Sequence, residues 1–267
     1  MNFIRGSLLV FVSVLLLISF LVLGIFATLN YSLKYEAVKP QVQSFIKEII
    51  KNEVNKTIIN EQIKILQTHC KTNSEYAFDD ETTNYTFVIP CGVISKGTDE
   101  IINEETNLLI EEYYYKKYEC KFLECFKESG IQWIIISQHA RDFWRSQYYT
   151  FLFISIILTG LIFLLVEKKN NFPILIGGLL ISGFLFILML SEISKFVVSS
   201  LASKVPFDLS SIALIFFSKA NSVFLIGLII GVILIAIGIF FKMIIIGLKI
   251  EHWFEKKDDS EKGKKIN

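Results

Sequence analysis

Four long apolar stretches constrain this chain more than any other feature of its sequence. They lie within residues 1–29, 148–166, 172–190 and 222–248. A helix that crosses the roughly 30 Å hydrocarbon core of a bilayer needs about 20 apolar residues, and each stretch comes close to or exceeds that length. None of them carries a charged side chain in its central turns. We therefore predict an all-α membrane protein with four transmembrane helices.

The first apolar stretch has two interpretations. It follows a short basic start that ends at Arg5, as a secretory signal peptide would. Its apolar core is longer than the roughly 7–15 residues of a signal peptide, and Ala27 is a poor cleavage site. We interpret residues 1–29 as a short cytoplasmic N-terminus and an uncleaved signal anchor.

The charges between the stretches predict how the chain is oriented in a cell membrane. The connector 167–171 is short and net positive, and the tail 249–267 is rich in lysine. Short positive loops stay in the cytoplasm. Both termini are therefore expected in the cytoplasm, and segments 30–147 and 191–221 are expected outside. The second outer segment is too apolar for free exposure, so it should lie on the membrane, pack under the first, or re-enter as a pore lining.

All four cysteines lie in the polar segment 30–147, which is the pattern of disulfides in an oxidising space. They are Cys70, Cys91, Cys120 and Cys125. Four cysteines allow three connectivities. The short spacing of the last two permits a local bridge, in which case the first two would close the other loop. A thiolate metal site with His69 is the alternative, but only one pair is closely spaced. We predict a disulfide-stabilised outer domain and no metal.

The same polar segment contains two Asn-X-Ser/Thr triplets, at Asn55 and Asn84. They are candidate glycosylation sites in a translocated segment. Such triplets also arise often by chance, so two ordinary surface asparagines are the alternative.

The outer domain is expected to be mostly helical. Apolar periodicity predicts helices over 32–67, with a bend at Pro40, and over 99–117. A third helix should start near Ile131 and run into the second transmembrane helix, since no glycine or proline interrupts it. The weakly alternating residues 83–89 predict an extended piece or a short strand.

Aromatic and small residues give the remaining structural signals. A run of tyrosines occurs at Tyr113, Tyr114, Tyr115 and Tyr118. Neighbouring side chains point in different directions around a helix, so at least one should be exposed, and exposed tyrosines suit interfaces. Local packing around the last two cysteines is the favoured alternative. In the fourth apolar stretch, close helix packing is predicted at Gly227, Gly231 and Gly238. Packing within one bundle is favoured there over dimerisation.

No sequence pattern indicates an enzyme. The apolar stretches hold no buried acid, histidine or arginine, and no nucleophile-elbow, zinc-protease or phosphate-loop motif occurs. No catalytic residue and no cofactor is predicted, and no basic surface suits nucleic acid. The predicted partners are the lipid bilayer and either a protein partner or a second copy. The sequence favours a non-enzymatic cell-surface protein that acts through its outer domain; an oligomeric pore or transport component is the alternative.

Overall fold

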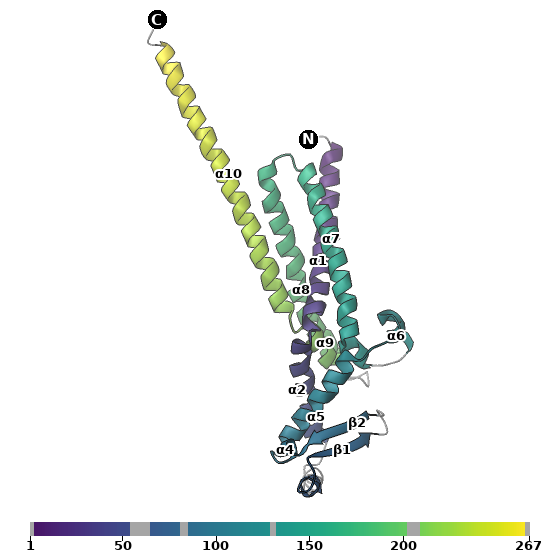
Figure 1. Ribbon diagram of the computed structural model, residues 1–267. Helices are drawn as coiled ribbons and strands as arrows, with labels where there is room; N and C mark the ends of the chain where they lie inside the picture. Colours follow the sequence, from purple (N-terminus) through teal and green to yellow (C-terminus); the bar gives the residue numbers. More distant parts are fainter. Residues whose placement is uncertain (1–2, 54–64, 81–84, 129–131, 202–208, 265–267) are drawn as a thin grey trace. The chain divides into compact units, whose positions relative to one another are not determined.

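The computed structural model describes residues 3–53, 65–80, 85–128, 132–201 and 209–264 (Figure 1). The chain divides into two compact units, which we describe separately. The apolar helix unit comprises Met1–Leu29, Arg145–Lys204 and Phe217–Asn267. The polar unit comprises Asn30–Trp144 and Val205–Phe216.

Four helices contain the apolar stretches. They are α1 (Phe3–Ser32), α7 (Gln138–Leu165), α8 (Phe172–Leu201) and α10 (Ala220–Lys264), and a short 3-10 helix, η2 (Lys169–Asn171), precedes α8. The segments long and apolar enough to cross a membrane are Phe3–Ser32, Gln138–Leu165, Lys169–Met189 and Ala213–Ile246. The prediction of a multi-pass, largely helical membrane protein is thereby confirmed. At 1.5 Å per residue, the 45 residues of α10 extend roughly 67 Å, so this helix continues well beyond a bilayer core.

The apolar helix unit has a core built from one stripe of each helix. On α1 the buried residues recur every three or four positions: Val12, Leu16, Phe20, Leu23 and Ala27. They pack with residues of the other three helices, including Ile162, Ile187 and Val223. Only 11–33% of the most apolar window of each helix is buried. Most of the apolar surface therefore faces outward, as a bilayer requires and water does not tolerate.

The polar unit is built from short helices and one hairpin. Its elements are α2 (Tyr35–Glu53), a helical turn at 65–69, β1 (Glu75–Asp80), β2 (Tyr85–Pro90), α4 (Cys91–Ile94), α5 (Thr98–Tyr115), α6 (Phe122–Glu128), the 3-10 helix η1 (Gln132–Ile136), the start of α7, and α9 (Leu209–Phe217). The strands pair antiparallel, with Tyr76 opposite Ile89. The larger core joins α2, α5, α6, η1, α7 and α9. A smaller core surrounds the fully buried Ile94.

Two helix starts differ from the sequence prediction. Helix α2 begins at Tyr35 rather than Ser32, after a break, and its predicted continuation through 54–64 lies outside the described residues. The helix predicted from Ile131 is wrong at its start, because α7 begins only at Gln138. Ser137 is the reason: its hydroxyl accepts a hydrogen bond from the Ala140 amide at 3.3 Å, as an N-cap does.

The second outer segment, predicted to begin at residue 191, also differs. Helix α8 continues through Leu201, and α9 follows within 209–217. Ile215 of α9 is buried in the larger core of the polar unit, and Phe216 packs against the same core. Helix α9 therefore packs with the polar unit, which was one of the three expectations for this segment.

Candidate functional site

A cluster of three tyrosine rings lies where the start of α2 meets the end of α5. The ring centroids of Tyr35 and Tyr114 are 5.3 Å apart, those of Tyr35 and Tyr115 are 5.5 Å apart, and those of Tyr114 and Tyr115 are 4.9 Å apart. We call these residues the tyrosine cluster. Successive residues of a helix point about 100° apart, so neighbours on α5 have different surroundings. Tyr114 is only 3% exposed, whereas Tyr115 is 48% exposed.

Tyr114 fixes the cluster to the core. Its hydroxyl donates a 2.7 Å hydrogen bond to the carbonyl of Leu33. Leu33 lies in the break between α1 and α2, where the carbonyl at the end of a helix needs an outside partner. Burial raises the pKa of Tyr114, and the nearby Arg141 guanidinium opposes part of that rise. This residue is therefore a structural anchor of the cluster.

Cations and acids surround the exposed side of these rings. The Nζ of Lys39 lies 5.6 Å from the ring centroid of Tyr35. Burial raises the pKa of Tyr35, with smaller contributions from Glu111 and Glu36. Two more lysines lie over tyrosine rings next to the cluster in the sequence. The Nζ of Lys34 is 4.6 Å from the ring centroid of Tyr31, and the Nζ of Lys116 is 5.7 Å from that of Tyr113. Exposed cation–π contacts of this kind contribute about 0.5–1 kcal/mol each, so they restrain the rings only weakly.

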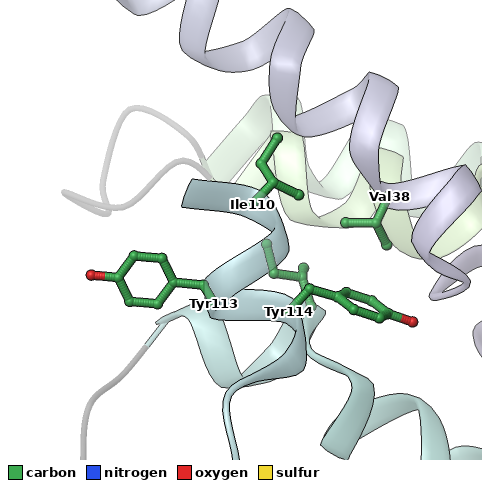
Figure 2. Close-up of a pocket in the computed structure, with 5 residues that line it drawn as sticks. Val38, Ile110, Tyr113 and Tyr114 are labelled. Atoms are coloured by element: carbon green, nitrogen blue, oxygen red, sulfur yellow. The ribbon is translucent and has the colours of Figure 1, made fainter. Parts of the chain in front are cut away.

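A small pocket opens beside the cluster (Figure 2). It is lined by Val38, Ile110, Tyr113, Tyr114 and Ile136. Its volume of about 10 Å³ is at the lower limit for one water molecule. Pockets that hold small molecules are typically about 300–1,000 Å³, so this one is too small for a substrate. Figure 2 shows the rings of Tyr113 and Tyr114 extending in opposite directions from α5.

Two further aromatic residues beside α6 have polar atoms without a hydrogen-bond partner among the described residues. These atoms are Tyr118 Oη and His139 Nε2, and the two rings are 5.7 Å apart. Burial is the main cause of the raised pKa of Tyr118, and Tyr113 adds to it. The ring centroid of Phe122 lies 6.3 Å from that of His139, and the side chain of Phe122 is apolar. The arrangement is a partly apolar core rather than a recognisable catalytic set.

The four cysteines form two pairs in the polar unit, and the structure chooses one of the three connectivities. Cys70 pairs with Cys91, and Cys120 pairs with Cys125, with Cα–Cα distances of 5.3 and 5.5 Å. Both distances lie within the usual range for disulfides. The first pair joins the turn after 65–69 to the first residue of α4, beside Ile94. The second closes the first turn of α6.

A metal site was the alternative role for the cysteines. In the part of the chain that the structure describes, no group of three or more metal-ligating residues occurs. His69 instead packs edge-on against Tyr76 at 5.2 Å, and its Nε2 lies 3.0 Å from the Asn73 amide nitrogen. The two candidate glycosylation sites, Asn55 and Asn84, lie outside the described residues.

The three glycines singled out in the fourth apolar stretch lie against α8 in the apolar helix unit. A Cβ at Gly227 would meet the Phe184 ring, and a Cβ at Gly238 would lie 3.0 Å from the backbone nitrogen of Ile174. A Cβ at Gly231 would lie 3.0 Å from the carbonyl oxygen of Gly177. Their lack of a side chain therefore lets two helices of one bundle approach closely.

Two polar contacts of the apolar helix unit were not anticipated from the sequence. The hydroxyl groups of Ser19 on α1 and Ser155 on α7 are 2.8 Å apart and buried. Arg5 donates hydrogen bonds to the carbonyls of Leu165 and Leu164 at the end of α7. The members of each contact are more than 130 residues apart, so no local pattern could have revealed them.

The chain matches no protein-family model, and neither a search of curated proteins nor one of solved structures found a significant similarity. Function must therefore be argued from the chemistry of this chain alone.

Proposed function

We propose that this protein is a non-enzymatic integral membrane protein of the cell surface, and that its outer domain, residues 30–147, mediates protein–protein interaction. The role would be adhesion, organisation or that of an accessory subunit. The observation that carries the proposal is the exposed ring of Tyr115 at the edge of the packed tyrosine cluster. The partner is either another protein or a second copy of this chain.

A tyrosine whose ring is restrained by neighbouring rings but remains exposed has the properties of an interface anchor. Tyrosine is enriched among the residues that dominate binding energy. The ring of Tyr115 contacts both Tyr35 and Tyr114. Because these contacts restrict its rotation before binding, less side-chain entropy is lost when a partner covers it. The proposed surface is thus partly pre-organised, with Lys39 at its edge.

The proposed location outside the cell has separate support. The two cysteine pairs lie in the polar unit, and disulfides persist in oxidising compartments. The contact of Arg5 with the end of α7 supports the proposal that the N-terminus and the positive connector 167–171 lie on the same side of the membrane. On this proposal α1 is the signal anchor, both termini are cytoplasmic, and Asn55 and Asn84 are available for glycosylation.

Site-directed photo-crosslinking on intact cells tests the proposal. A photoreactive phenylalanine analogue at position 115 should give a covalent adduct, whereas the same analogue at the exposed Lys71 should not. Adding Tyr35→Ala to the position-115 probe should reduce the adduct, because it removes a ring that orients the probe. The mass of the adduct shows whether the partner is a second copy.

Two substitutions and one deletion complete the design. Tyr115→Ala should weaken the association about 10-fold or more, while Tyr115→Phe, which keeps the ring, should retain most of it. Deleting residues 35–140 should abolish it. If that deletion leaves every association of the protein unchanged, the outer domain is not its interaction surface and the proposal is wrong.

A further inference from the structure

The last turn of α7 is closed by two cations from separate parts of the chain. The final carbonyl groups of a helix have no partner within it. Arg5, 160 residues away in sequence, donates from Nε to the carbonyl of Leu165 at 2.8 Å and from Nη2 to that of Leu164 at 3.3 Å. The Nζ of Lys169 donates to the carbonyl of Phe163. A guanidinium and an ammonium group are therefore held on one helical turn.

Two more lysines lie at this end of the apolar helix unit. Lys168 directly precedes Lys169 and is exposed. Helix α10 contacts η2, and Gly238 of α10 lies against Ile174 in the first turn of α8. Lys242 is exposed and lies about one turn beyond Gly238, on the side of η2. Figure 1 shows the N-terminal end of α1 beside the connection between α7 and α8.

The charge at this end is strongly unbalanced. Against the four cations, the only carboxylate that the described residues place in the connector is that of Glu167. The carbonyl end of α7 contributes about half a negative charge, and the N-terminal ends of α1 and α8 each contribute about half a positive charge. Neither of those two helices has an acidic residue in its first turn. The four cations and Glu167 thus sum to a formal net charge of +3, and the three helix ends together add about half a positive charge.

These cations keep free donors after they close the helix. Arg5 uses two of its five N–H groups on carbonyls, and Lys169 uses one of its three. Lys168 is exposed directly before the span that begins at Lys169, and Lys242 is exposed about one turn before the end of the span Ala213–Ile246. Groups at that depth lie at the level of the lipid headgroups, where the charged tips of long side chains collect.

We propose that this end of the bundle, comprising Arg5, Lys168, Lys169 and Lys242, binds the phosphate-bearing headgroup of an anionic phospholipid. The attraction of anionic lipid to a cationic cluster beside a membrane span amounts to about five-fold in affinity per lysine or arginine. The inference concerns a different unit from the tyrosine cluster, so it does not depend on the proposed interaction surface.

Native mass spectrometry of the purified full-length protein tests this inference. Phosphatidylserine and phosphatidylcholine with identical acyl chains are titrated separately, and bound lipids are counted. We expect phosphatidylserine to bind at least about 25-fold more tightly, the contribution of two cations at about five-fold each. The double variant Lys168→Gln, Lys242→Gln should lose about 25-fold in phosphatidylserine affinity and keep its affinity for phosphatidylcholine. Neither lysine has a hydrogen bond to the end of α7 among the described contacts, so the helix cap stays intact.

The matched control is Lys219→Gln, which removes a cation next to the opposite end of α10 and should change neither affinity. Equal binding of the two lipids by the unmodified protein would overturn the proposal, and so would an equal loss in the control variant. Inorganic phosphate at matched ionic strength should not displace the lipid. Displacement at comparable concentrations would show that a free anion, rather than a headgroup, is the ligand.

Discussion

The closest backbone approach in the apolar helix unit gives the sharpest test of its packing. Gly177 of α8 faces α10, where a Cβ would lie 2.6 Å from the carbonyl oxygen of Gly231 and 3.2 Å from the backbone nitrogen of Ile235. The adjacent Gly178 has nothing within 4 Å of an added Cβ. Alanine at position 177 should therefore push two helices apart, whereas alanine at position 178 should not.

The magnitude follows from comparing the two variants. Both positions lie inside α8, so replacing glycine by alanine gains a similar helix-propensity term of about 0.5–1 kcal/mol at each. That term cancels in the difference. What remains is the overpacking at Gly177, where the obstacle is backbone rather than a flexible side chain, and overpacking costs typically about 1–3 kcal/mol. We expect Gly177→Ala to be less stable than Gly178→Ala by about that amount.

Reversible unfolding of the purified protein in lipid bicelles measures the difference directly. Steric trapping or a denaturant titration gives the free energy of unfolding of both variants under the same conditions. The unmodified protein should lie below Gly178→Ala and above Gly177→Ala. Equal stability of the two alanine variants would refute the close contact of α8 with α10, and the role of Gly231 in it.

Four further substitutions test three contacts that hold other parts of the structure. Ser19→Ala and Ser155→Ala should show a coupling of about 0.6 kcal/mol, and at most about 1.7 kcal/mol, in a double-mutant cycle of unfolding free energies; strict additivity would mean that the hydroxyls do not bond. Tyr114→Phe should destabilise the protein by about 1–3 kcal/mol, because it leaves the Leu33 carbonyl without its donor; a neutral effect in thermal unfolding would contradict this. Since the pKa of Tyr114 is raised in the folded protein, its stabilising effect is complete below about pH 10 and is lost as the pH rises further, so stability curves between pH 8 and 11 should fall less steeply in the Phe variant. Arg5→Gln should lower the unfolding free energy by about 0.3–1 kcal/mol through loss of the α7 cap, and an unchanged value would mean that water replaces the guanidinium without cost.

The transmembrane helices were predictable because their signal is local. Length and hydropathy over a window of about 20 residues are sufficient to recognise a span, and no distant contact changes that result. Helix α5 (Thr98–Tyr115) was also found to within two residues, from its apolar periodicity. Signals of this kind depend on residues within a few turns of one another.

The errors arose where a single residue, or pairing with a neighbouring strand, decides the structure. Because no glycine or proline interrupts residues 131–147, the sequence showed no break within the predicted helix, yet Ser137 caps α7 through one hydroxyl group. The strand β1 (Glu75–Asp80) carries three acidic residues, which are poor strand formers, and it exists because β2 provides its hydrogen-bond partners. The composition of β1 alone therefore gave no strand signal.

In the candidate site, too, the local feature was predictable from the sequence and the long-range contact was not. The tyrosine run predicted that at least one ring would be exposed, but not which one. The choice between Tyr114 and Tyr115 depends on the Leu33 carbonyl, which lies 81 residues before Tyr114 in the chain. The cationic end of the apolar helix unit was read from sequence only as a charge bias. Its geometry depends on Arg5 meeting the end of α7, which requires the folded bundle.

The two proposed surfaces belong to different units, and this allows a decisive combined experiment. Tyr115 lies in the polar unit, while Lys168 and Lys242 lie in the apolar helix unit. Substitutions at separate sites with no shared partners usually add within about 0.3–0.5 kcal/mol. Tyr115→Ala should therefore leave the phosphatidylserine preference unchanged, and the double lysine variant should leave crosslinking from position 115 unchanged. A loss of crosslinking in the lysine variant would contradict that independence. It would mean that headgroup binding and partner binding bias the same conformational equilibrium, because energetic coupling between distant sites requires such a shared element.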